Sequence, residues 1–180
     1  MDENDLVSGL KRRDEDSFIQ IVELYKKKVL SLCYSYIEDM QDAEDTSQEV
    51  FIALYNGISS FKGNSSLSTY IYRITLNKCI DFKRKKSIKV FLSGLIETKE
   101  ENNADIDEKR FIRSCIKKLP EKLRTPIVLY YYIGLNQGEI AEILGVTSKN
   151  VEGKIYRAKQ RLRSEFEKEG YGLCSKNGMI

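Results

Sequence analysis

Histidine and tryptophan are absent from the 180-residue sequence, and proline occurs only twice. Histidine is the commonest general base near neutral pH, so its absence argues against most acid–base enzymes and against a zinc site of histidine and cysteine. The four cysteines are scattered without a CxxC spacing, at Cys33, Cys79, Cys115 and Cys174. This pattern is not a disulfide framework, and we predict buried, reduced thiols, no metal site and no cofactor.

Long apolar runs are missing as well. No 18-residue apolar stretch is present, and residues 1–18 lack the apolar core of a signal peptide, which together predict a cytoplasmic protein. The rarity of proline and the long stretches rich in Leu, Ile, Lys and Glu favour an all-α fold. The length suits one medium domain or two small ones.

Charge is distributed unevenly along the chain, although the net charge is only +3. Residues 1–60 carry a net charge of −7, and residues 61–96 carry +7. Residues 97–110 return to −3, and residues 111–180 reach +6. Two basic blocks separated by an acidic segment suggest two contacts with a polyanion.

Apolar residues recur every three or four positions in the first half of the chain and predict three amphipathic helices. The first spans Asp16–Ile37, with Asp16 or Ser17 as its N-cap. The second helix spans Met40–Ile58, and its expected buried residues are Ala43, Ser47, Val50, Phe51 and Leu54. After a polar loop, the third helix begins near Ser68 and ends in the basic run Lys83–Lys86.

Residues 87–110 lose this periodicity and are polar and acidic, which predicts a flexible linker. A second helical unit follows the linker. Pro120 should lie just inside a helix start. Pro126 should begin or kink a segment whose buried body is Ile127–Ile133.

The segment Leu135–Leu162 has the pattern of a helix-turn-helix. Asn136 and Glu139 predict a capping box, Gly145 permits a tight turn, and Thr147 can cap the next helix. That helix keeps an apolar stripe inside, formed by Val151, Ile155, Ala158 and Leu162. A solvated helical hairpin could carry the same basic outer face, but the full combination favours a helix that enters the major groove of DNA.

Four strings, taken in order, resemble the extracytoplasmic-function sigma factors, the small two-domain members of the main bacterial sigma family. They are "DAEDTSQEVFIALY", "SSLSTYIYRITLNKCIDFKRK", "LPEKLRTPIVLYYYIGLNQGEIAEILGV" and the basic helix that follows. The resemblance covers Asp14–Lys86 and Phe111–Glu167. It implies two small helical domains: sigma region 2 at residues 1–86 and sigma region 4 at residues 111–170. An acidic linker at 87–110 would join them, and 171–180 would form a tail.

The stretch Gln41–Phe51 holds four carboxylates, which a DNA backbone would repel. They could simply form a solvated acidic face. In the family, however, this helix binds the clamp helices of the largest RNA polymerase subunit, and the flap of the second-largest subunit is also implied as a partner. The resemblance therefore assigns polymerase binding to Asp42, Asp45, Gln48 and Glu49.

The resemblance gives the first basic block a role at the −10 promoter element. The loop Phe61–Ser68 is similar to the segment that takes up a flipped base, where Gly63 lets the backbone approach closely. The family usually has tryptophan where this chain has Tyr70, which is more often a core residue than a reader, and Tyr72 carries the same qualification. The implied −10 residues are Lys62, Gly63, Asn64, Ser65, Ser66, Tyr70, Tyr72, Arg73, Asn77, Lys78, Asp81 and Arg84.

The helix-turn-helix would read the −35 element with the N-terminal half of its second helix. Glu152 departs from the Lys or Arg that is common in the family, so promoter specificity should differ from the common family sequence. Lys159, Arg161 and Arg163 are more plausible as phosphate contacts or solvated charges. The implied −35 residues are Lys149, Asn150, Glu152, Gly153, Lys154 and Arg157.

These assignments predict an alternative sigma factor that brings core RNA polymerase to promoters and has neither a catalytic centre nor a small-molecule substrate. An anti-sigma factor, often membrane-anchored, would hold it inactive, so it would lie at the nucleoid or at the inner face of the membrane. A helix-turn-helix regulator that needs no polymerase would explain Leu135–Leu162 alone. A nuclease holding Mg²⁺ with Asp42, Asp45 and Glu49 would need a further acidic cluster, and none stands out.

Overall fold

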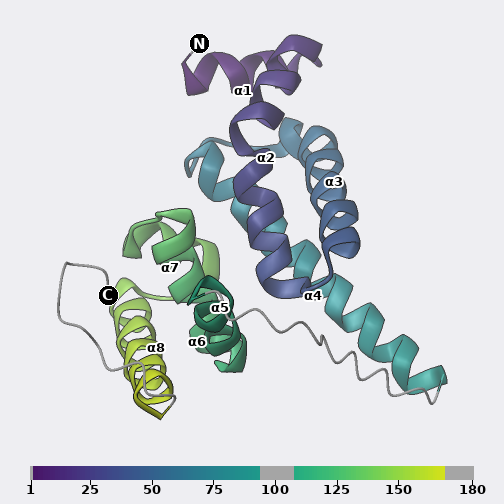
Figure 1. The fold of residues 1–180 in the computed structure, drawn as a ribbon. Coiled ribbons are helices and arrows are strands. Elements are labelled where there is room, and N and C mark those ends of the chain that lie inside the picture. The colour runs from purple at the N-terminus through teal and green to yellow at the C-terminus, as the bar shows by residue number, and fades with distance from the viewer. Residues whose placement is uncertain (1, 94–107, 169–180) are drawn as a thin grey trace. The chain divides into compact units, whose positions relative to one another are not determined.

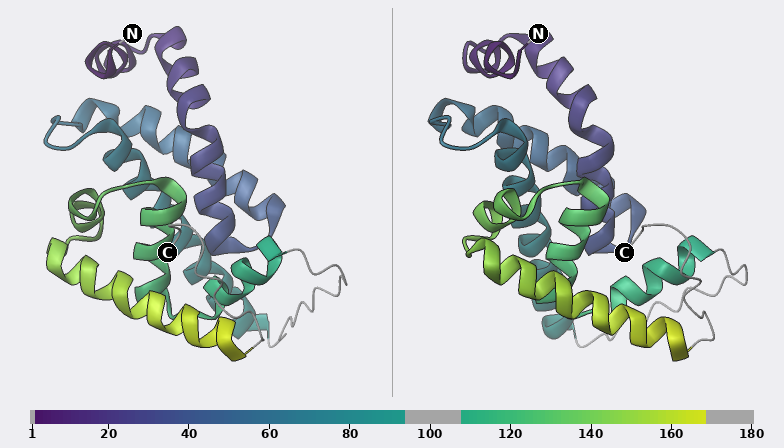
Figure 2. Two further views of the ribbon diagram at one scale, coloured as in Figure 1. Left: turned by 60° about the vertical axis from the view of Figure 1, so that its left-hand side comes forward. Right: turned by 90° about the vertical axis from the view of Figure 1, so that its left-hand side faces the viewer.

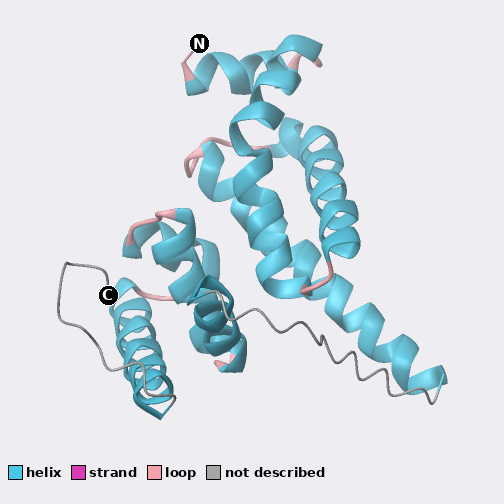
Figure 3. Ribbon diagram, in the orientation of Figure 1, coloured by secondary structure: helices cyan, strands magenta, loops and turns pink. Residues whose placement is uncertain are grey.

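A computed structural model of the chain describes residues 2–93 and 108–168. Within these ranges every regular element is a helix, as the cyan ribbons of Figure 3 show. The all-α prediction is therefore confirmed. The chain divides near residue 98 into two compact units, as the prediction of two small helical domains requires.

The first unit is a bundle in which α2, α3 and α4 all contact one another, while α1 lies across the start of α2 (Figures 1 and 2). Side chains that are almost fully buried line the centre of this bundle, and each large one stabilises it by about 1.5–3 kcal/mol. They include Ile21, Val29, Leu32, Val50, Leu54 and Ile71. The helices are α1 (Glu3–Lys11), α2 (Glu15–Ile37), α3 (Met40–Gly57), the 3₁₀ turn η1 (Ile58–Ser60) and α4 (Leu67–Ser93).

Helix α2 begins at Glu15, one residue before the predicted start at Asp16, because Asp14 is its N-cap. The backbone N–H and the hydroxyl of Ser17 both donate to Asp14 Oδ2, at 2.8 and 2.5 Å. These hydrogen bonds hold the pKa of Asp14 below its usual value. The expected cap at Asp16 or Ser17 was wrong, since Ser17 is fully buried and serves as the donor.

Helix α1 was not predicted, and it performs two structural tasks. Its residues Leu6 and Leu10 are buried, and Gly9 lies against Ser17 at the start of α2. Its residue Glu3 lies beside the start of α4, where Oε1 accepts a hydrogen bond from the backbone N–H of Leu67 at 2.7 Å. Helix α1 therefore helps to satisfy the free N–H groups at the start of α4.

Two further details of the first unit differ from the sequence-based expectation. In α3 the buried hydroxyl residue is Thr46, which is 4% exposed, rather than Ser47. Thr46 faces inward, and its hydroxyl donates a hydrogen bond to the Asp42 carbonyl. Helix α4 continues to Ser93, seven residues past the predicted end at Lys86. The sequence holds neither glycine nor proline between Leu67 and Gly94, so nothing local ends the helix at Lys86.

The cysteines that the structure describes are free and buried, as predicted. Cys33 of α2 and Cys79 of α4 are in contact, and their hydrogen bond together with burial raises the pKa of the Cys79 thiol above its usual value. Cys115 is buried in the second unit. The prediction for Cys174 lies outside the described residues.

The second unit packs α6 against α8 and α7 against α8 (Figure 1). Its first helix begins at Glu108, three residues before the predicted domain start, so helices occupy both ends of the proposed linker 87–110. The linker residues 94–107 and the tail 171–180 lie outside the described residues. The elements are α5 (Glu108–Lys118), α6 (Glu121–Val128), the π-helical turn η2 (Leu129–Ile133), α7 (Gln137–Leu144) and α8 (Ser148–Lys168).

The segment Ile127–Ile133 is only partly a buried body. Leu129 and Ile133 are buried, whereas Tyr130, Tyr131 and Tyr132 between them are 37%, 46% and 56% exposed. Residues four apart share one face of a helical turn, so the three between them point outward. Pro120 is the N-cap residue of α6 rather than its first residue, and Pro126 lies inside that helix.

No helix among the residues that the structure describes has the length and hydropathy that a membrane crossing requires.

We expect Gly9→Ala to destabilise the first unit by about 1–3 kcal/mol, because the new Cβ would lie 2.0 Å from Ser17 Oγ and 2.8 Å from Ser17 Cβ. Urea unfolding followed by circular dichroism measures this change. Ser8→Ala is the matched control, since Ser8 is an exposed neighbour on the same helix. Equal stability of the two variants would contradict the close packing of α1 on α2.

Candidate functional site

The predicted polymerase-binding residues all lie on α3, but they are not equivalent. Asp45, Gln48 and Glu49 are exposed, whereas Asp42 is half-buried in the first turn of the helix. Among the residues that the structure describes, no cation pairs with Asp45. The sequence therefore placed these side chains on one accessible helix, as three- and four-residue spacing requires.

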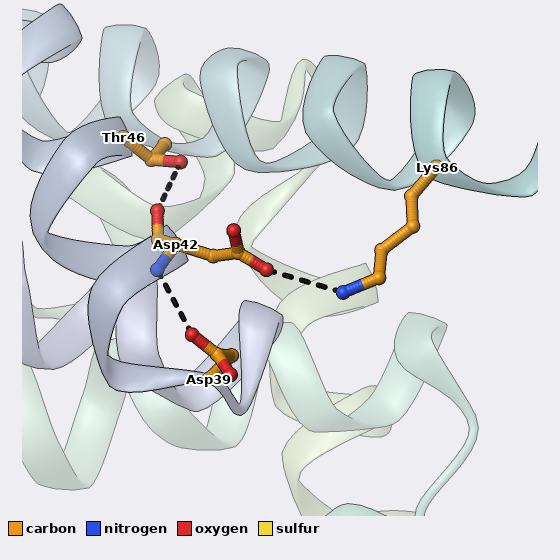
Figure 4. Close-up of polar contacts among 4 residues, drawn as sticks. All are labelled: Asp39, Asp42, Thr46 and Lys86. Carbon is orange, nitrogen blue, oxygen red and sulfur yellow. Dashed lines mark hydrogen bonds and ion pairs between the residues drawn. The ribbon is translucent and has the colours of Figure 1, made fainter. Parts of the chain in front are cut away.

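Asp42 is held by its neighbours and directed toward α4 (Figure 4). Its backbone N–H donates to the N-cap Asp39 at 3.0 Å, and its carbonyl accepts from the Thr46 hydroxyl at 2.8 Å. Its carboxylate lies 3.1 Å from Lys86 Nζ. Lys86 also lies over the ring of Phe82, with 5.5 Å between Nζ and the ring centroid.

A second ion pair joins the same two helices. Glu49 Oε2 lies 3.0 Å from Lys78 Nζ, and Lys78 is one of the predicted −10 residues. The four side chains of the two pairs are between 33% and 59% exposed, so each pair lies in solvent and contributes only about 0.2–1 kcal/mol. Sequence reasoning missed both pairs, although the acidic charge of one helix and the basic charge of the other were visible.

The loop before α4 presents a short exposed polar surface. Gly63 has a φ of +74° and no atom within 4 Å of where its Cβ would be. Lys62 and Asn64 are exposed, and Ser65 is half-exposed. Ser66 differs from them, because its hydroxyl accepts from the Thr69 N–H at 3.2 Å and so acts at the start of α4.

The two tyrosines predicted for the −10 surface have structural roles. Tyr72 is 2% exposed and packs edge-on against Tyr25, with ring centroids 6.2 Å apart. Tyr70 is half-buried, its ring packs on Phe61 at 4.9 Å, and its hydroxyl donates to the Gly57 carbonyl at 3.3 Å. Tyr70 thus fixes the beginning of the loop, and Tyr72 belongs to the core.

The remaining residues predicted for the −10 surface follow one stripe of α4. Arg73, Asn77, Asp81 and Arg84 are spaced three or four apart, so they lie on the face opposite the core. Asn77 and Arg84 are exposed, while Arg73 and Asp81 are half-buried. Arg84 also pairs with Asp81 at 3.1 Å. This stripe begins near the exposed loop and carries two arginines, which suits contact with phosphates.

Local capping builds the helix-turn-helix of the second unit as predicted. The Asn136 side chain accepts from the N–H groups of Gly138 and Glu139, and Glu139 accepts from the Asn136 N–H at 2.8 Å. Gly145 takes the left-handed conformation with a φ of +63°. Thr147 Oγ1 then accepts from the Asn150 N–H at 3.2 Å at the start of α8.

The first turns of α8 carry the predicted −35 residues on an accessible surface. Lys149, Asn150, Glu152 and Arg157 are exposed, and Gly153 and Lys154 are half-exposed. The predicted inner stripe of Val151, Ile155, Ala158 and Leu162 is buried, so the basic face points away from the core.

A groove between α6 and α8 adds cations that the sequence analysis did not group with this helix. Lys122 of α6 lines it together with Lys154, Arg157 and Arg161 of α8. Lys122 lies 32 residues before Lys154 in the sequence, so no local pattern could join them. A surface with four cations suits a polyanion.

No group of three or more Cys, Asp or Glu side chains within 2–93 and 108–168 is arranged to hold a metal ion. Asp42 and Glu49, the proposed Mg²⁺ ligands of the nuclease alternative, face different lysines.

Comparison with known proteins links both units to one family. Residues 21–88 match the family described as Sigma-70 region 2, and residues 111–162 match Sigma-70, region 4. The chain is 34% identical over 176 residues to the ECF RNA polymerase sigma factor SigW of Bacillus subtilis. That alignment covers 89% of this chain and 94% of SigW.

Two solved structures share the fold. CnrH, in complex with the cytosolic domain of CnrY, superposes with a TM-score of 0.76 at 24% identity, over 93% of this chain and 98% of CnrH. The sigma factor RpoE, in complex with the anti-sigma factor NepR from Bartonella quintana, gives a TM-score of 0.72 at 21% identity. That superposition covers 83% of this chain and 96% of RpoE.

We expect Gly145→Ala to destabilise the second unit by about 1–2 kcal/mol, because alanine at a φ of +63° is strained. Gly153→Ala is the control in the same unit, since its Cβ would meet nothing closer than the Arg157 guanidinium at 3.8 Å. Urea unfolding curves of the two variants provide the comparison. A loss of stability in Gly153→Ala but not in Gly145→Ala would refute the turn assignment.

Proposed function

The chain belongs to the sigma-70 family of RNA polymerase sigma factors, in its extracytoplasmic-function group, and on this basis we propose how its surfaces divide the work of initiation. It is an alternative sigma factor, which directs promoter-specific transcription. Members of this family act as initiation factors rather than as enzymes. The proposed domains are residues 1–86 for region 2, 87–110 for the linker and 111–170 for region 4.

Helix α3 is the proposed docking surface for core RNA polymerase. The observation that carries this proposal is the exposed acidic face of α3, with Asp45 unpaired among the described residues and Gln48 and Glu49 beside it. A phosphate backbone would be repelled by this face, whereas basic side chains on the clamp helices of the largest subunit would pair with it. Such pairing would mainly guide association and register.

The loop before α4 and the outer stripe of α4 are the proposed −10 surface. Asn64 and Ser65 offer hydrogen-bonding groups to an unpaired base, and the exposed Gly63 backbone leaves room for its approach. Arg73, Asn77 and Arg84 continue the surface along α4 toward the phosphates. Tyr72 is excluded from this surface by its burial, and Tyr70 acts as a positioning residue.

The start of α8 is the proposed −35 surface, with Lys149, Asn150, Lys154 and Arg157 directed toward the major groove. Glu152 is exposed on the same turns and could accept a hydrogen bond from a cytosine amino group. Gly153 has no side chain, so the backbone of α8 is accessible on this face. The groove cations Lys122 and Arg161 would hold a phosphate strand beside the recognition helix.

An anti-sigma factor is the proposed regulator. RpoE, which shares this fold, is known in complex with the anti-sigma factor NepR, and a factor of this type would be active whenever made unless it were sequestered. Membrane anchoring of that partner would hold the chain at the inner face of the membrane until release to the nucleoid. A second proposed contact joins region 4 to the flap of the second-largest polymerase subunit.

A helix-turn-helix regulator that works without polymerase is less well supported. It would use α7 and α8, but it would leave the acidic helix α3 and the polar loop before α4 without a purpose. The family matches in both units favour the sigma assignment.

Run-off transcription tests the proposal. Core RNA polymerase with the full chain should transcribe DNA taken upstream of the chain's own gene, because factors of this family commonly act on their own promoters. We expect Asp45→Lys to lower both transcript and core binding at least tenfold, since it places a cation against the basic clamp helices.

Glu44→Lys is the matched control, because Glu44 is an exposed acid on the same helix outside the proposed contact set and the charge change is identical. Equal losses in the two variants would mean that net charge, not the α3 surface, governs binding. Absence of both transcript and core binding by the wild-type chain would overturn the proposed function.

We expect Arg157→Ala to weaken binding of the holoenzyme to that promoter duplex by about 5- to 150-fold, as loss of a base-edge contact does. Arg163→Ala should have little effect, because Arg163 pairs with Glu167 at 3.1 Å farther along α8. Fluorescence anisotropy with a labelled duplex measures both. A larger loss for Arg163→Ala than for Arg157→Ala would place the DNA contact near the C-terminal end of α8 and contradict the proposed −35 surface.

A further inference from the structure

The two ion pairs between α3 and α4 connect side chains with opposite proposed partners. Glu49 lies 3.0 Å from Lys78, and Asp42 lies 3.1 Å from Lys86. The carboxylates belong to the proposed polymerase surface, and the lysines belong to the basic helix that would follow DNA. In the free chain the carboxylates therefore neutralise lysines that DNA would bind, and the lysines neutralise carboxylates that polymerase would bind.

We propose that these pairs couple polymerase binding to DNA binding by an exchange of partners. When basic side chains of polymerase pair with Asp42 and Glu49, Lys78 and Lys86 are released to phosphates. The exchange favours both contacts together over either one alone. This inference rests on the proposed function, because it assumes that α3 meets a basic protein surface and that α4 meets nucleic acid.

The exposure of the pairs is what permits the exchange. Lys78 and Glu49 are 33% and 59% exposed, and Lys86 and Asp42 are 45% and 36% exposed. A buried ion pair would leave an uncompensated charge when its partner left, which is a large cost. A solvent-exposed pair is replaced at little cost by water or by another ion.

The spacing of the two pairs places both of them on one strip of the α3–α4 interface. Asp42 and Glu49 are seven residues apart on α3, and Lys78 and Lys86 are eight residues apart on α4. Each interval is about two helical turns, so the two helices hold one pair at each end of a shared strip. Both pairs are therefore accessible from the same edge, where α3 and α4 are in contact.

The expected strength of the coupling follows from the exposure of the pairs. An exposed ion pair changes an equilibrium by at most about fivefold, so the two pairs together give at most about 25-fold. Because linkage is reciprocal, DNA should raise the affinity for polymerase by the same factor by which polymerase raises the affinity for DNA. The device therefore strengthens joint binding of polymerase and DNA and does not act as an absolute block.

The test uses the free full-length chain and a fluorescein-labelled oligodeoxythymidylate as a sequence-independent single-stranded probe. We expect Glu49→Gln to raise the affinity about two- to fivefold over the wild-type chain and to steepen its salt dependence by about one released counterion, because Lys78 becomes available. Glu44→Gln makes the same charge change on the same helix, and no cation pairs with Glu44 among the described residues. It should produce a smaller gain and no change in salt slope.

Lys78→Gln completes the comparison. It should cost more affinity in the Glu49→Gln background than in the wild-type background, because only there is the lysine available for phosphate. Equal gains from Glu49→Gln and Glu44→Gln, or equal costs of Lys78→Gln in the two backgrounds, would overturn the coupling. The measurement contains no polymerase, so a failed core-binding experiment refutes the proposed function separately.

Discussion

Burial of one face of α4 against α2 and α3 determines the direction of the proposed DNA-facing side chains that α4 carries. Ile71, Thr75 and Cys79 are completely buried and lie at four-residue intervals on that face. The stripe that carries Arg73 and Asn77 must then face outward. Two oxygen atoms help to hold the start of α4, one from Ser66 and one from Glu3 of α1. Helix α1 thus supports the proposed DNA-facing surface without belonging to it.

Ion pairs contribute little to the stability of the first unit, and this small contribution allows the charges to exchange partners. The acidic α3 and the basic α4 would each carry strong self-repulsion if they stood alone, and their contact relieves part of it through exposed ion pairs. The stability of the bundle comes from its apolar core, so the surface charges remain free to change partners. A buried charge network in the same place would tie folding to binding.

Local chemistry made much of the structure predictable. The end of α2 at Ile37, the start of α3 at Met40 and the whole helix-turn-helix follow from spacing and caps within a few residues of one another. Contacts between distant residues were missed, because no local pattern encodes them. Examples are the bond from Glu3 to Leu67, the pair of Glu49 with Lys78, and the place of Lys122 beside α8. The cap at Asp14 was missed for another reason: Asp16 and Ser17 are equally suitable cap residues by type, and only the burial of Ser17 and its hydrogen bonds to Asp14 decide for Asp14.

The tyrosine at position 70 illustrates how a departure from the family pattern can leave a surface intact. A residue that read DNA directly would need an exposed ring, yet the Tyr70 ring packs on Phe61 and its hydroxyl reaches the Gly57 carbonyl. These two contacts tie the first turn of α4 to the end of α3 and to the beginning of the loop. The exposed Asn64 and the half-exposed Ser65 lie in a loop whose two ends are fixed, at Phe61 and at Ser66. The aromatic residue at this position therefore fixes the geometry of the loop that we propose meets DNA, and the tyrosine ring makes both contacts.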